Sequence, residues 1–217
     1  MNVLMQDAFV AVDATGLVIM RNDNPLQPLV GTLTVTAQST TTGLQVGGAL
    51  ATIPVALPRG AAATAWACLG SSGGGGGGGQ CADPAASLAA VGCAANGTDC
   101  ALVSTLQLQG SGAVAAQNTQ LWAVPSALAL ARGVTVTTAV GQLDAEGALP
   151  VTLTVQGGAA VLVVLTTQAA GRFSDNALVI VPEGQRVLRF LPMLPGAALD
   201  RELLASTLRV EHLSQYL

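Results

Sequence analysis

The clearest pattern in the chain is a strict alternation of apolar and hydroxyl side chains between residues 32 and 37. Leu33, Val35 and Ala37 alternate with threonines, and a period of two predicts a strand with one buried face and one wet face. Residues 8–12 and 17–20 flank an Asp-Ala-Thr-Gly turn, which predicts a hairpin. Further strands are predicted at residues 49–56, 61–69, 101–108 and 119–124.

Regular alternation resumes after residue 133. Strands are predicted at residues 134–140, 151–155, 159–165, 177–181, 185–192 and 207–211, with a short helix-like connection at 200–202. Short strands with turn signals between them favour an all-β chain, and roughly 100 residues suffice for a seven-stranded sandwich. We therefore expect two consecutive β-sandwich domains, residues 1–132 and residues 133–217, of which the second is immunoglobulin-like.

Residues 70–99 lack any such period. Ser71 and Ser72 lead into seven consecutive glycines, residues 73–79, and a tract of this kind behaves as a flexible coil. A phosphate-cradling loop would need a Gly-Lys-Ser/Thr sequence, but the chain contains no lysine. We expect a disordered low-complexity insertion at about 70–99 in a surface loop of the first domain.

The cysteines cluster around this insertion. They are the disulfide candidates Cys68, Cys81, Cys93 and Cys100. Their wide spacing and the presence of a single histidine, His212, disfavour a zinc site, whereas disulfides suit an oxidising compartment. Four cysteines allow three pairings. Asn96 opens an Asn-Gly-Thr glycosylation sequence, so in a secreted protein we expect Cys93 to pair with Cys100 and Asn96 to carry a glycan.

Charge and hydropathy exclude several classes of partner. Charged residues make up 9% of the chain, with 8 basic residues against 12 carboxylates, so a basic surface for nucleic acid is not expected. The longest strongly apolar run, residues 159–165, is shorter than the ~20 residues of a membrane-spanning helix. The first residues lack the basic start and apolar segment of a secretory signal. We expect neither a nucleic-acid nor a membrane partner.

One segment concentrates specific polar and aromatic side chains between two apolar strands. It consists of Gly171, Arg172, Phe173, Ser174, Asp175 and Asn176. We interpret it as a corner that joins two sheets, in which glycine permits unusual backbone and the polar side chains bond neighbouring amides. Phe173 is expected to be the apolar anchor and Arg172 to face solvent.

This Gly-Arg-Phe-Ser-Asp-Asn motif is followed by Arg-x-x-Arg-Phe-x-Pro at 186–192 and by Leu-Arg-Val-Glu-His-Leu at 208–213, close to Tyr216. The set closely resembles the C-terminal end of lysosomal-type β-mannosidases, which are family-two glycoside hydrolases. The resemblance continues more weakly upstream through residues 118–122 and the Cys93 to Cys100 loop, and it is expected to cover the whole chain. It implies that the chain is the non-catalytic C-terminal β-sandwich part of an enzyme that hydrolyses terminal β-D-mannose residues of oligosaccharides.

The resemblance also implies partners and a location. In that family both catalytic glutamates lie in a (β/α)₈ barrel, which would be the intramolecular partner of this chain. Mannose-containing oligosaccharides would be met only through the parent enzyme, and the location would be lysosomal, vacuolar or extracellular. The isolated chain would be inactive.

The chain's own polar residues offer little chemistry. A glycosidase needs two carboxyl groups, and the nearest sequence pairs are Asp144 with Glu146 and Asp200 with Glu202, all in turn or connection contexts. We expect no catalytic residue, no cofactor site and no metal site. His212 is interpreted as a packed histidine. Asp175 and Asn176 offer too few oxygens for calcium, so a turn-stabilising role is favoured.

Two other readings stay open. A free-standing carbohydrate-binding or adhesion module should expose an aromatic platform, but aromatic residues make up only 3% of the chain. A truncated gene product, in which Met1 is an internal methionine, would be compatible with the β-mannosidase reading.

Overall fold

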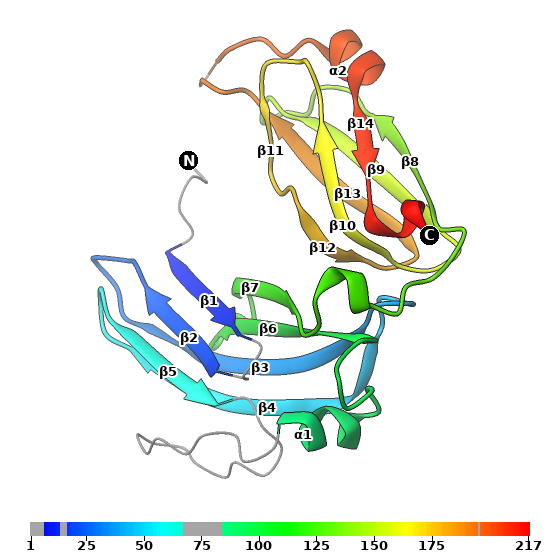
Figure 1. Cartoon of the computed structure of the whole chain (residues 1–217). Helices are drawn as coiled ribbons and strands as arrows, with labels where there is room; N and C mark the ends of the chain where they lie inside the picture. Colours follow the sequence, from blue (N-terminus) through cyan, green and yellow to red (C-terminus); the bar gives the residue numbers. More distant parts are fainter. Residues whose placement is uncertain (1–6, 14–16, 67–83, 195) are drawn as a thin grey trace. The chain divides into compact units, whose positions relative to one another are not determined.

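The computed structural model describes residues 7–13, 17–66, 84–194 and 196–217, drawn in colour in Figure 1. About half of these residues are in strands and few are in helices, which confirms the all-β prediction. The chain forms two compact units: residues 1–39 with 44–128, and residues 40–43 with 129–217. The tip at 40–43 is counted with the second unit, where the Thr40 hydroxyl donates to the carbonyl of Ala129 over 2.6 Å.

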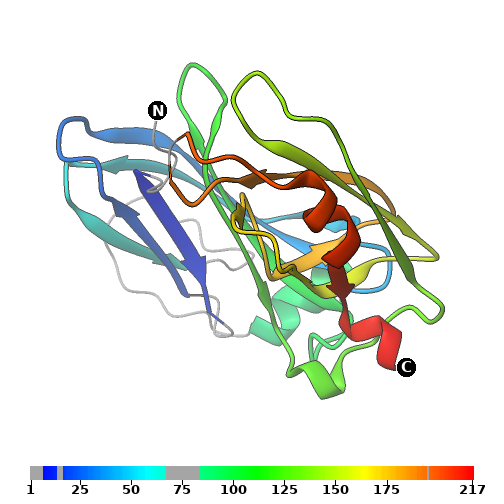
Figure 2. The same ribbon diagram turned by 90° about the horizontal axis from the view of Figure 1, so that it is seen from above.

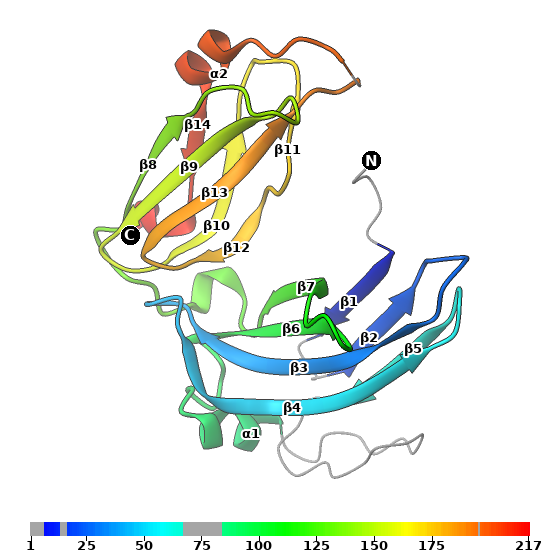
Figure 3. The same cartoon turned by 180° about the vertical axis from the view of Figure 1, so that it is seen from behind.

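The first unit has two antiparallel sheets (Figures 1 and 3). The three-stranded sheet has the order β1 (Ala8–Val12), β2 (Leu17–Asn22), β5 (Ala62–Trp66). The four-stranded sheet has the order β4 (Gln45–Leu57), β3 (Leu29–Ser39), β6 (Cys100–Leu108), β7 (Val114–Leu121). The β1–β2 pair, dark blue in Figure 2, confirms the predicted hairpin.

One hydrophobic core joins the two sheets of the first unit. Val10 of β1, Val18 of β2 and Leu102 of β6 all belong to it. In β3 the buried residues include Leu33 and Val35, each 0% exposed, while the intervening threonines keep partial access to solvent. The alternation in the sequence therefore predicted this strand and its buried face correctly, although β3 extends further in both directions.

The expected disordered insertion at 70–99 is wrong for its second half. Residues 84–91 form helix α1 (Pro84–Val91), and residues 92–99 form a turn that leads into β6. The helix is ordered because Leu88, 1% exposed, enters the core of the first unit. The seven glycines and the rest of 70–83 lie outside the described residues.

The second unit is again a two-sheet sandwich (Figure 1). One sheet has the order β11 (Arg172–Phe173), β13 (Gly184–Leu191), β9 (Leu149–Gln156), β8 (Thr135–Val140). The other has the order β12 (Leu178–Val181), β10 (Ala160–Thr166), β14 (Arg209–Glu211). Alternate residues of β9 are buried, as expected for a strand with one face on a core.

Short helices complete the second unit. The 3-10 turn η1 (Pro125–Ala127) precedes it, and α2 (Arg201–Thr207) leads into β14 and then η2 (Leu213–Tyr216), coloured orange to red in Figure 2. Asp200 caps α2, because its carboxylate accepts a hydrogen bond from the amide of Leu203 over 2.8 Å. Among the described residues there is no helix with the length and hydropathy needed to cross a bilayer.

Candidate functional site

The corner at residues 171–176 connects the two sheets of the second unit. β11 pairs with β13 in one sheet, and β12 pairs with β10 in the other. Ser174 ties the corner to the first of these sheets, because its amide donates to the Arg189 carbonyl over 2.6 Å and its hydroxyl accepts from the Arg189 amide over 3.0 Å.

Asn176 ties the same corner to the second sheet. Its side-chain nitrogen donates to the Leu165 carbonyl over 2.9 Å, and its side-chain oxygen accepts from the Leu165 amide over 2.8 Å. The same oxygen accepts from the amide of Ala177. The side chain thus substitutes for a strand partner of β10, in the way that asparagine satisfies backbone groups at turns.

The first half of the corner works differently from what the sequence indicated. Gly171 is required for close approach rather than for an unusual φ, since a Cβ atom there would overlap the Phe190 ring and lie 2.8 Å from the Leu191 carbonyl oxygen. Phe173 is only half-buried, and its ring lies 5.0 Å from that of Phe190. Phe190, 0% exposed, is the fully buried aromatic of this core. Arg172 keeps partial exposure.

The corner does not assemble a metal site. The Asn176 side-chain oxygen is already bonded to two amides. Asp175 is half-exposed and lies 3.9 Å from the Arg186 guanidinium. Calcium needs six to eight oxygen ligands. The Asn176 oxygen is bonded to backbone amides and the Asp175 carboxylate faces solvent, so the two residues do not provide such a set.

Asp144 and Glu146 share one cation. A side-chain oxygen of Asp144 lies 2.9 Å from one terminal nitrogen of Arg189, and one of Glu146 lies 2.7 Å from the other. Asp144 also accepts hydrogen bonds from the amides of Ala148 and Glu146. The bond from Ala148 is the main cause that lowers the pKa of Asp144 below its usual 3.8, with further contributions from the Glu146 amide and from Arg189.

This lowered pKa decides against acid catalysis by Asp144. A glycosidase general acid must hold its proton near neutral pH, which requires a raised pKa. Asp144 is instead held as a carboxylate that shapes the β8–β9 turn and accepts from its amides. The carboxylates of Asp144 and Glu146 are both paired with the Arg189 guanidinium. We interpret this arrangement as one that stabilises the β8–β9 turn.

The second carboxylate pair lies at α2. Asp200 serves as the N-cap, and Glu202 is exposed in the first turn. Arg201 donates to the carbonyls of Gly141 and Val140 and so fastens α2 to the end of β8. An open hollow of about 730 Å³ here is lined only by residues of this one segment. It lacks the polar groups converging from several elements that a binding site requires.

His212 is a packed histidine, as the sequence indicated. It is 5% exposed, and burial lowers its pKa below 6.5. Within the part of the chain that the structure describes, its Nδ1 atom has no hydrogen-bond partner. A histidine that activates a nucleophile bonds to it, and among the described residues no nucleophile is bonded to Nδ1.

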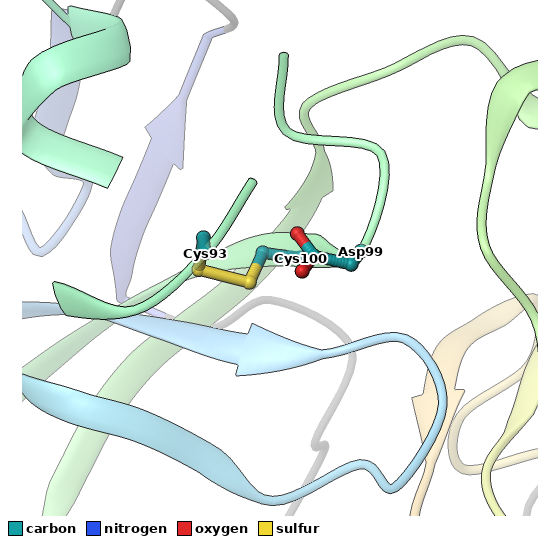
Figure 4. A group of neighbouring side chains, drawn as sticks. All are labelled: Cys93, Asp99 and Cys100. Atoms are coloured by element: carbon teal, nitrogen blue, oxygen red, sulfur yellow. A yellow bond between two sulfur atoms is a disulfide. The ribbon is translucent and has the colours of Figure 1, made fainter. Parts of the chain in front are cut away.

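Cys93 and Cys100 form a disulfide, shown in Figure 4, with their Cα atoms 6.0 Å apart. Asp99 lies beside the two sulfurs, but the thiols are committed to each other and its carboxylate accepts from the Ala94 amide over 2.8 Å. The group is therefore a cross-link and not a metal site. Cys68 and Cys81 lie outside the described residues, while Asn96 is exposed at the loop between the bonded cysteines.

Sequence reasoning missed Asn22, which is 1% exposed. Its side-chain nitrogen donates to the carbonyls of Gln27, Leu57 and Pro58 at 3.0, 3.4 and 3.1 Å. This network joins the end of β2 to the end of β4, which is a structural role. The Asn-Asp-Asn-Pro sequence signalled a break in the strand pattern, yet nothing local identifies the distant carbonyls.

The chain was compared with protein families, curated proteins and solved structures. Residues 127–216 match a family model named Ig_mannosidase and described as an Ig-fold domain. Among curated proteins, no sequence matches the chain. The second unit is therefore immunoglobulin-like, and over residues 127–216 it is similar to the domain that this model describes.

Solved structures of similar fold include the exo-chitosanase CsxA of Amycolatopsis orientalis, with a TM-score of 0.53 and 14% identity over 96% of this chain. Complexes of two variants of that enzyme with PNP-beta-D-glucosamine match with TM-scores of 0.52 and 0.53, identities of 14% and 15%, and the same 96% of this chain. The chain spans only 25–26% of the length of these structures. At this level of identity the likeness shows the fold alone.

Proposed function

We propose that this chain is the non-catalytic β-sandwich portion of a longer β-mannosidase of the family-two glycoside hydrolases, an enzyme that removes terminal β-D-mannose residues from oligosaccharides. The observation that carries the proposal is the match of residues 127–216 to the mannosidase Ig-fold model. The corner motif at 171–176 lies inside this span. Its polar side chains hold the two sheets of the domain together, so the residues that carry the resemblance also build the fold.

The role of the chain in such an enzyme is support for the catalytic domain. The likeness to the exo-chitosanase over 96% of the chain covers both described units and about a quarter of that enzyme, which supports a place for both sandwiches beside a larger remainder. Asp144 and Glu146 are paired with Arg189, Asp200 caps α2, and Glu202 is exposed in the first turn of that helix. Hydrolysis would therefore depend on carboxyl groups supplied by a separate catalytic barrel.

The proposed location is a lysosome, a vacuole or the extracellular space. The Cys93–Cys100 disulfide supports it, because disulfides persist in oxidising compartments and are rare in the cytosol. A free-standing carbohydrate-binding module is supported less well. Among the side chains that the structure describes, each unit exposes one aromatic, Phe9 at 45% and Tyr216 at 69%, whereas a platform for a sugar face needs several aromatic rings side by side.

The proposal is tested on the native gene product. Antibodies raised against the purified 217-residue chain should recover from source cells a polypeptide longer than this chain that cleaves an aryl β-D-mannoside. Recovery of a product of this chain's own length without glycosidase activity would overturn the proposal. Cleavage of an aryl β-D-glucosaminide with no cleavage of the mannoside would replace the mannosidase assignment with an exo-glucosaminidase.

The purified chain provides the matched control. It should show the β-rich circular dichroism of a folded protein and no turnover of either aryl glycoside above a buffer blank. Turnover by this folded chain would contradict its non-catalytic role, even if the native product proved to be a β-mannosidase.

A further inference from the structure

The loop between Cys93 and Cys100 supports the proposed location through its disulfide, and it also carries an exposed asparagine. The two half-cystines are buried, at 6% and 1% exposure, whereas Asn96 between them is exposed. The Asp99 carboxylate accepts from the Ala94 amide and closes the loop a second time inside the disulfide. The base of the loop is thus fixed in the core of the first unit, and Asn96 is presented to solvent.

The chemistry at this exposed position is specific. Asn96 is the one asparagine of the sequence that is followed two residues later by serine or threonine, which is the acceptor pattern for N-linked glycans. The Thr98 hydroxyl donates to the side-chain oxygen of Asn96 over 3.0 Å, and the Thr98 amide approaches the same oxygen at 3.4 Å. These contacts polarise the side-chain amide of Asn96 through its oxygen and leave its nitrogen unbonded within the described residues.

The middle position of the pattern is constrained by packing. Gly97 has φ +65°, and a Cβ atom there would overlap the Trp122 side chain. Glycine is therefore required by the fold at this point. The glycosylation pattern rejects only proline in the middle position, so the constraint imposed by Trp122 is compatible with modification.

The disulfide and the acceptor point to the same compartment. A disulfide persists where the environment is oxidising, and N-glycosylation marks a surface loop of a secreted protein. From the exposed asparagine, the engaged threonine hydroxyl and the disulfide that closes the loop, we propose that Asn96 is an N-glycosylation site. The donor would be an oligosaccharide attached through its anomeric carbon to a polyprenyl diphosphate.

The transfer is balanced without an oxidant. A bond forms between the side-chain nitrogen of Asn96 and the anomeric carbon, while the bond from that carbon to the diphosphate oxygen breaks. The lipid diphosphate departs with the bonding electron pair, and the proton lost from the amide nitrogen neutralises one of the resulting charges.

The test uses the full 217-residue chain behind a secretory signal, translated in the presence of endoplasmic-reticulum microsomes. Only protease-protected chain with the Cys93–Cys100 bond closed is scored, by mass spectrometry. The expected result is a single added oligosaccharide that peptide N-glycosidase removes with conversion of residue 96 to aspartate. Protected, disulfide-closed chain without a glycan at Asn96 would overturn the proposal.

Three variants separate the acceptor from the loop that carries it. Thr98→Ser keeps the hydroxyl and should keep the glycan. Thr98→Ala should lose it. Asn96→Asp retains the oxygen that accepts from Thr98 and so preserves the loop, but it offers no amide nitrogen and should be unmodified with the disulfide intact. A glycan that persists in both Thr98→Ala and Asn96→Asp would place the modification elsewhere and refute the assignment.

Discussion

Replacing Asn176 by alanine should destabilise the second unit more than the same replacement of its neighbour Asp175, although both side chains are exposed. The Asn176 side chain bonds both the amide and the carbonyl of Leu165. Leu165 is 2% exposed while Asn176 is exposed, so the two bonds are part-buried and water replaces them only in part once the side chain is removed. The substitution leaves a donor and an acceptor of β10 unpaired while it removes little apolar contact.

The magnitude follows from that loss. A buried polar group left unsatisfied costs about 1–3 kcal/mol, whereas a typical hydrogen bond contributes a net ~1 kcal/mol. We therefore expect Asn176→Ala to cost about 2 kcal/mol. By contrast, the Asp175 side chain is 52% exposed and lies 3.9 Å from Arg186. Asp175→Ala should stay within ~0.5 kcal/mol, as surface changes usually do.

Native-state hydrogen exchange on the full chain measures the effect where it arises. A loss of 2 kcal/mol corresponds to roughly 30-fold faster exchange, which should appear in peptides that cover β10 and β12. Both tryptophans, Trp66 and Trp122, lie in the first unit. Their fluorescence during urea unfolding therefore reports on the first unit and should be unchanged, which makes it an internal control.

Two results would refute this reasoning. If Asn176→Ala left exchange in β10 unchanged, the hydrogen bonds to Leu165 would not hold the corner. If Asp175→Ala proved as damaging as Asn176→Ala, the alternative that Asp175 and Asn176 together bind calcium would be favoured. In that case the addition of Ca²⁺ should slow hydrogen exchange in the wild-type chain. We expect Ca²⁺ and a chelator to have no effect.

Three further predictions concern the same unit. Phe190→Ala should cost about 3–5 kcal/mol because the ring is fully buried, and Phe173→Ala clearly less, by urea unfolding followed by far-UV circular dichroism. Ala177→Gly should stabilise by up to about 1 kcal/mol, since the exposed Ala177 has φ 55° and the left-handed conformation costs ~1–2 kcal/mol for alanine; a loss of stability would contradict this. Burial lowers the pKa of His212 below 6.5, so the unfolded chain binds a proton first. Stability is then complete above pH 6.5 and declines as pH falls through that value towards the folded-state pKa. Urea midpoints at about pH 8 and about pH 5 should therefore differ less in His212→Phe than in the wild type.

The sequence was most informative where one local rule determines the structure. The alternation in β3 predicted its buried face because side chains alternate with period two in any strand. The corner at 171–176 was found because polar residues interrupt two apolar runs, and its Ser174 and Asn176 do bond backbone groups. Local rules could not say which aromatic fills the core. Phe173 and Phe190 lie in paired strands. The structure shows that Phe190 is the enclosed ring, because it is 0% exposed and packs against Gly171.

The prediction failed where ordering depends on a distant partner. Residues 84–91 look like an alanine-rich extension of a glycine tract, and the helix is recognisable only once Leu88 is seen in the core. Asn22 shows the same limit, because two of the carbonyls it binds belong to Leu57 and Pro58, far away in sequence. Burial of a polar side chain is favourable only when its partners are in place, and sequence spacing does not contain that information.

The same limit applies to the carboxylate pairs, for which the turn contexts indicated no catalytic role but the sequence did not identify their partner. Asp144 and Glu146 are close together in the chain, as a catalytic pair could be, and the residue that decides their chemistry is Arg189. Its guanidinium and the turn amides hold Asp144 ionised, opposite to what a proton donor needs. If Arg189 were replaced by leucine, the Coulombic and hydrogen-bonding contributions of its guanidinium would be lost. The Ala148 and Glu146 amides would still lower the pKa of Asp144, so the pair would remain a turn and not become a catalytic site.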